Sequence, residues 1–120
     1  MAVGCDSGSV GRTRDEFKDL YSRRDYSKAS RTLTKILNGC TKTMWWLDLG
    51  SIRNDLAITQ YHLHRPKDCL KTLEPLAADA SLSDEDIRKN FAPTDADNYL
   101  PIVRATRTNL ELCRKSSEKH

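Results

Sequence analysis

Apolar residues recur at three- and four-residue intervals along most of this chain, and this helical spacing constrains its fold more than any other feature. The clearest stretch carries Tyr26, Ala29, Leu33, Ile36 and Leu37. Because residues at this spacing share one face of a helix, each such stretch predicts an amphipathic helix. No segment alternates apolar and polar residues for more than a few positions, so no strand is expected. The expected fold class is all-α.

Capping residues and turn formers divide the chain into separate helices. Thr13 begins a capping-box pattern, and Asn38 with Gly39 is typical of a helix end. Pro66 suits the first turn of a helix, whereas Pro93 is expected to break one. The expected helices cover 13–23, 26–39, 45–63, 66–77, 84–90 and a last stretch from 97 or 101 to 115.

Length and composition favour one domain. A chain of 120 residues can bury one modest core, and its 38% hydrophobic and 31% charged content suits a thin helical layer. Residues 1–12 are rich in Gly and Ser and show no periodicity, so we expect a flexible N-terminal arm. A single domain is expected over 13–115, followed by a tail at 116–120.

Charge and hydropathy argue against nucleic-acid binding and against a membrane-spanning segment. The net charge is +3, and the charges of both signs are interspersed rather than gathered in a basic stripe. A nucleic-acid partner would favour such a stripe. No stretch approaches the roughly 20 apolar residues of a membrane-spanning helix. We expect neither a nucleic-acid partner nor a transmembrane segment.

Four cysteines stand far apart, at positions 5, 40, 69 and 113, which excludes the C-x-x-C pairs of zinc and thioredoxin sites. We expect Cys69 and Cys113 to face each other and form a disulfide, with Cys40 as the next candidate partner. The segment that ends at Cys5 resembles the end of a bacterial lipoprotein signal, although an incidental Cys in a disordered tail fits it too. Localisation stays open between cytoplasmic and exported or periplasmic.

The two leading hairpins contain Tyr26 with Ala29, Leu56 with Ala57, and the stretches 61–64 and 69–76. In these residues the chain resembles tetratricopeptide (TPR) repeats, over about 13–78. The sequence departs from the family in having no Gly at the two turns, and in a hairpin spacing longer than about 34 residues. The resemblance implies a right-handed stack of about two helix-turn-helix hairpins, with the last helix as its cap.

A partner-binding groove follows from the same resemblance, because the leading helices of such hairpins line a concave face. The positions carried over to that face are Arg14, Lys18, Tyr21, Asn54, Ile58, Tyr61, His62 and Arg107, with Arg104 as an alternative to the last. The implied function is a protein-protein interaction module, an adaptor or scaffold, and the cations favour an acidic partner. Alternatively, the tyrosines pack inside the fold and the charges form a solvated face.

No pattern supports catalysis, so we expect no enzyme, no cofactor and no metal site. His62 and His64 are two positions apart and point to different sides of a helix. A catalytic thiol at Cys69 or Cys113 would need a His as base and an acid that orients it, and the sequence places neither near them. Two further functions remain open: an exported bacterial inhibitor or immunity protein that plugs a toxin enzyme, and a hydrolase built on the acidic segment 84–97. Of Trp45 and Trp46, one is expected in the core and the other half-buried.

Overall fold

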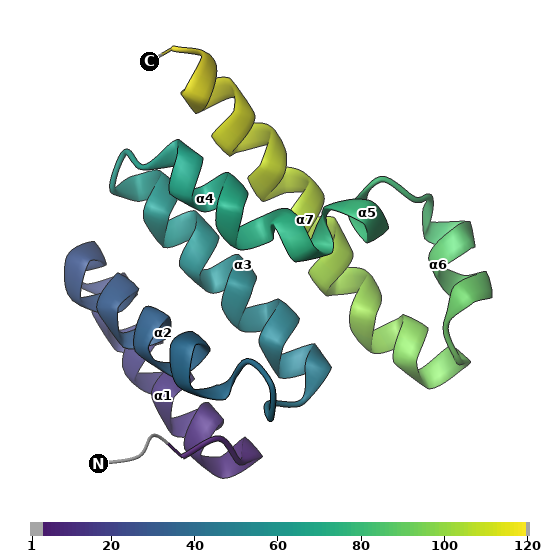
Figure 1. Cartoon of the computed structure of the whole chain (residues 1–120), viewed down its shortest axis with the longest axis horizontal. Helices are drawn as coiled ribbons and strands as arrows, with labels where there is room; N and C mark the ends of the chain where they lie inside the picture. Colours follow the sequence, from purple (N-terminus) through teal and green to yellow (C-terminus); the bar gives the residue numbers. More distant parts are fainter. Residues whose placement is uncertain (1–3, 120) are drawn as a thin grey trace.

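The computed structural model describes residues 4–119 of the chain, and every regular element among them is helical (Figure 1). The prediction of an all-α fold is confirmed. The α-helices are α1 (Ser7–Ser22), α2 (Tyr26–Cys40), α3 (Trp46–His62), α4 (Pro66–Leu73), α5 (Ala77–Ala80), α6 (Asp84–Asn90) and α7 (Pro93–Glu118). A single 3₁₀ turn, η1 (Glu74–Leu76), joins α4 to α5.

Two helical hairpins, α1 with α2 and α3 with α4, form the first two thirds of the fold and share one turn geometry. Arg24 and His64 take the same place in the two turns, and both have a φ of 60°. In the first turn the amide of Arg24 donates to the carbonyl of Tyr21, and that of Asp25 to the carbonyl of Leu20. The same two bonds recur 40 positions later in the second turn. Helices α1 and α3 therefore both end in a Schellman motif, in which a residue with left-handed backbone conformation follows the helix. Gly usually occupies that position.

Helix α3 is the centre of the molecule, because it packs against α1, α2, α4 and α7 (Figure 1). One group of buried apolar residues joins α1, α2 and α3, and a second joins α3, α4 and α7. A third lies where the start of α3 meets α6 and α7. Gly50 allows the close approach of α3 and α7, since a Cβ there would stand 3.0 Å from Ile102 Cγ2. The core thus continues from the hairpins into the last helix.

The flexible arm predicted for 1–12 is wrong over 7–12, which form the first turns of α1. Asp6 caps this helix by accepting a 2.9 Å hydrogen bond from the amide of Ser9. Val10 is only 1% exposed and belongs to the core. Residues 1–3 of that arm lie outside the described residues. Cap and core contacts here outweigh the low helix propensity of the glycines.

Helix α7 is longer than expected at both ends. Pro93 begins it rather than breaking the preceding element, because the missing N–H of a proline costs nothing at the first helical position. Pro101 lies inside the helix with an exposed side chain. The tail predicted for 116–120 is helical as far as Glu118. Among residues 4–119 no helix combines the length and hydrophobicity needed to cross a membrane.

Two disulfides hold the helices together, one of them expected and the other not. The predicted bridge between Cys69 and Cys113 is confirmed, with Cα atoms 6.3 Å apart, and it ties α4 to α7. Cys40 bonds instead to Cys5, with Cα atoms 5.4 Å apart, so the segment before α1 is tied to the end of α2. A lipid thioether at Cys5 would need the sulfur that this disulfide uses. Each bridge closes a loop worth about 4 kcal/mol in the chain-entropy model.

Candidate functional site

Two of the predicted groove residues of α1, Arg14 and Tyr21, bond to side chains of α3. Arg14 donates from Nε and Nη2 to Asp55 Oδ2, at 3.2 and 3.1 Å. One heptad further along both helices, Tyr21 Oη lies 3.0 Å from His62 Nε2. Two cross-links of equal sequence separation therefore fasten the first hairpin to the second.

Opposing effects act on the pKa of Asp55 at the contact between α1 and α3. Burial raises its pKa above the ordinary value, while the charges of Arg14 and Lys18 and the hydrogen bond from Arg14 lower it. The effect of burial is larger, and the pKa is raised. Lys18 is exposed and forms no ion pair within residues 4–119. Arg14 is thus paired with Asp55 inside the fold, whereas the exposed Lys18 remains available to a partner.

Aromatic rings surround the second cross-link. The His62 ring stacks on Tyr26 with centroids 4.6 Å apart and planes 9° apart, and meets Tyr21 and Tyr61 edge-on. All four side chains are half-buried. Tyr21, Tyr61 and His62 therefore pack against neighbours in the fold and are only partly available to a partner. Ile58 is half-buried as well.

Asn54, expected in the groove, is instead buried at 6% exposure, so that assignment is wrong. Its Nδ2 donates to the carbonyl of Gly50 at 3.0 Å and to Thr106 Oγ1 at 2.9 Å. Its Oδ1 accepts from Asn109 Nδ2 at 3.0 Å. Helix α7 covers this side of α3, and Asn54 is the centre of a polar network between the two helices.

Arg107 is also committed to the fold rather than to a groove. It donates to the carbonyls of Ala80 and Leu82 at 3.1 and 2.6 Å, and to Asp84 Oδ1 at 2.7 Å. Arg104, its alternative, donates to the other oxygen of Asp84 at 2.8 Å. The hydrogen bonds from both arginines lower the pKa of Asp84. Arg107 thus fastens α7 to the segment between α5 and α6.

The tryptophans at the start of α3 are the large hydrophobic side chains that residues 4–119 leave exposed. Trp45 is 53% exposed and Trp46 is 38% exposed, so the expectation that one of them lies in the core is wrong. Trp46 stacks on Phe91 at 5.7 Å and meets Tyr99 edge-on at 5.0 Å. The core position that one Trp was expected to fill belongs to Leu47. Trp45 has no ring partner among the described residues.

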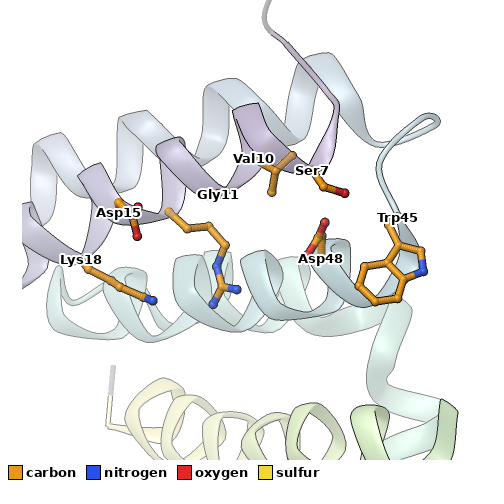
Figure 2. Close-up of a pocket in the computed structure, with 8 residues that line it drawn as sticks. Ser7, Val10, Gly11, Asp15, Lys18, Trp45 and Asp48 are labelled. Atoms are coloured by element: carbon orange, nitrogen blue, oxygen red, sulfur yellow. The ribbon is translucent and has the colours of Figure 1, made fainter. Parts of the chain in front are cut away.

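A pocket of about 190 Å³ opens between α1 and the start of α3, beside Trp45. Figure 2 shows the Trp45 indole at one end of this pocket, Asp48 next to it and Lys18 at the other end. Its lining residues are Ser7, Val10, Gly11, Arg14, Asp15, Lys18, Trp45 and Asp48. Two of the predicted groove residues, Arg14 and Lys18, therefore share a hollow with an exposed tryptophan. We call these eight residues the Trp45 pocket.

Trp45 also occupies an unusual position for its residue type. It is the N-cap of α3, and its side chain makes no capping hydrogen bond. The N-caps of α1, α2 and α6 are Asp6, Asp25 and Ser83, and each accepts a hydrogen bond from a backbone amide of its helix. Ser, Thr, Asp or Asn at such a position stabilises a helix by about 0.5–2 kcal/mol relative to Ala. The start of α3 therefore lacks the stabilisation of a capping side chain, and an exposed indole stands in that position.

Tyr99 and Asp79 form a structural pair outside this region. Tyr99 Oη donates to Asp79 Oδ2 at 2.6 Å, and burial together with this bond raises the pKa of Tyr99 far above its ordinary value. Over the described part of the chain, no three His, Cys, Asp or Glu side chains are placed to hold a metal ion.

Comparisons with known proteins give no relative of this chain: no protein-family model, no curated protein and no solved structure matches it.

Proposed function

We propose that this chain is a protein-binding module and that its docking site is the Trp45 pocket. The observation that carries the proposal is an indole that is 53% exposed at a helix N-cap it does not cap. The exposed half of this side chain neither fills the core nor caps the helix, so folding does not account for it. Exposed tryptophans are, in contrast, the residues most enriched at the energetic centres of protein interfaces.

The size of the site favours a protein side chain over a small molecule. Its volume of about 190 Å³ falls below the roughly 300–1,000 Å³ of typical small-molecule sites. Covering the exposed half of an aromatic side chain removes about 100 Å² from water, which is worth about 2.5 kcal/mol. An inserted side chain of a partner would gain this contribution at the indole and further contacts at the exposed Gly11.

Charge in the pocket is balanced, which alters the expected partner. The lining contains two cations, Arg14 and Lys18, and two carboxylates, Asp15 and Asp48. The expectation of an acidic partner rested on the predicted groove cations and on the amide of Asn54, but Asn54 and Arg107 are bonded within the fold. We propose instead a partner that presents an apolar or aromatic anchor surrounded by charges of both signs. Binding should then depend more on the indole than on salt concentration, because exposed charge pairs are worth only about 0.2–1 kcal/mol each.

The two disulfides support a rigid body that works in an oxidising compartment. Rigidity lowers the entropy cost of binding, since little of the module must be ordered when the complex forms. The likeness of the two hairpins to TPR repeats belongs to this proposal too. It rests on residues such as Ala29 and Ala57, which are fully buried.

Capture from an extract tests the proposal when three forms of the oxidised protein are compared. The wild type should retain a protein that Trp45→Ser loses. Arg65→Ser is the matched control, because Arg65 is an exposed N-cap without a capping bond at the start of α4. A protein retained equally by all three forms, or by none, would sink the proposal.

A second candidate is an exported inhibitor of a toxin enzyme, which the two disulfides favour for the same reason. The captured protein would then be a single enzyme whose activity falls when the wild type is added. Trp45→Ser should relieve that inhibition if the Trp45 pocket makes the contact.

A further inference from the structure

A second cavity, of about 290 Å³, lies between α2, α3 and α4 and shares no lining residue with the Trp45 pocket. Its lining is Thr34, Leu37, Asn38, Thr41, Arg53, Leu56, Gln60, Lys71 and Thr72. Two of these residues are cations and five carry hydroxyl or amide groups, yet none is acidic. The cavity is therefore rich in hydrogen-bond donors and positively charged.

Arg53 is the centre of this cavity. It is partly buried, and its one hydrogen bond runs from Nη1 to the carbonyl of Thr72 at 3.2 Å. No carboxylate within residues 4–119 pairs with it. Burial alone lowers its pKa from the ordinary value. A partly buried guanidinium has five donors in a rigid fork that matches a carboxylate or a phosphate, and here most of them have no protein acceptor.

Neighbouring groups add donors rather than acceptors. The Thr72 hydroxyl donates to Gln60 Oε1 at 2.8 Å, so Gln60 has its amide NH₂ left for a ligand. Lys71 is exposed and makes no ion pair among the described residues. Lys71 also lines a neighbouring hollow together with Glu74, one turn further along. The cavity itself has no acidic residue in its lining, so nothing in that lining neutralises Arg53.

We propose that this cavity binds an oxyanion, a phosphate or carboxylate group, through Arg53 and Lys71. The guanidinium fork holds two oxygens of the anion, the Lys71 ammonium neutralises it from the rim, and the amide of Gln60 completes the donor set. The same chemistry could come from a small free anion or from a glutamate side chain of a protein partner. The cavity volume of about 290 Å³ lies just below the roughly 300–1,000 Å³ of typical small-molecule sites, which suits a small anionic group.

Amide chemical shifts of the oxidised protein test this site. Inorganic phosphate, citrate and a tetraglutamate peptide are titrated separately at constant ionic strength and pH. Saturable shifts are expected at cavity amides such as Thr34, Asn38 and Thr72, with none at Gly11 of the Trp45 pocket. Phosphate or citrate as the tighter ligand identifies a free anion, and the peptide as the tighter ligand identifies a partner's carboxylate.

Variants decide whether the cations of the cavity cause the shifts. Arg53→Gln should weaken binding of the tightest probe by about tenfold or more, because it removes a charge-assisted fork. Lys71→Gln lies on the exposed rim, should leave the fold intact, and should weaken binding less. Arg31→Gln, an exposed arginine of α2 outside the cavity, is the matched control and should change nothing. The proposal is overturned if no probe gives saturable shifts, or if neither cavity variant weakens binding more than the control.

Discussion

Replacing Trp45 by Ala and by Ser separates what this position does for the fold from what it does for binding. Either change removes the covered half of the indole, about 100 Å² and at most about 2.5 kcal/mol of unfolding free energy. The serine hydroxyl can then accept a hydrogen bond from the first turn of α3, which alanine cannot. Ser should therefore be more stable than Ala by about 1 kcal/mol.

Urea unfolding followed by far-ultraviolet circular dichroism measures this difference without relying on the indole that is removed. A gain of about 1 kcal/mol moves the midpoint by about 0.5 M urea, given a slope of about 2 kcal/mol/M. Trp46 supplies the matched control, because it is the first helical residue rather than the cap. Its Ala and Ser variants should differ by less than about 0.5 kcal/mol. If the two Trp45 variants are equally stable, the argument that Trp45 occupies a capping position at the expense of the helix fails.

Three further outcomes follow from the contacts that hold the helices. Arg65→Asp should raise the unfolding free energy by about 1 kcal/mol, because Asp25 caps α2 from the same place in the first hairpin; an unchanged urea midpoint would contradict this. Tyr21→Phe removes the hydrogen bond to His62 and should lower the unfolding free energy by about 0.5–1.5 kcal/mol in the same assay, whereas no loss would mean that this bond does not join the hairpins. Reduction of both disulfides should remove about 8 kcal/mol from an unfolding free energy of about 5–15 kcal/mol, so thermal scans should show a chain that is unfolded or nearly so. An unaltered thermal transition in a protein whose four thiols are all labelled would refute this.

The sequence was sufficient for most of the helical regions and for one disulfide, but not for the first turns of α1 or for the ends of α7. Periodicity alone places Cys69 and Cys113 on the apolar faces of two helices, and two such faces must meet in a small core. The bridge from Cys5 was missed because Gly and Ser suggested a flexible arm. The signals for order there were the Asp6 cap and Val10, an isolated apolar residue that reaches the core only in the folded chain.

Site residues were harder to predict, because a groove depends on which helix covers which face. Asn54 has the spacing of a groove residue, but α7 packs over it, and no pattern in the sequence gives that contact. Arg14 looks like a free cation until Asp55, 41 positions later, is brought beside it. Trp45 carried a readable signal, namely a large aromatic where a capping side chain would be expected, but that signal depends on where α3 begins.

An amide footprint of the captured partner on the isotope-labelled chain shows whether a protein partner docks at the Trp45 pocket. We expect shift changes or broadening at Gly11, Asp15, Lys18 and Asp48, which line the pocket, and at the Trp45 indole N–H. A footprint that leaves these signals unchanged and falls on other helices would contradict the claim.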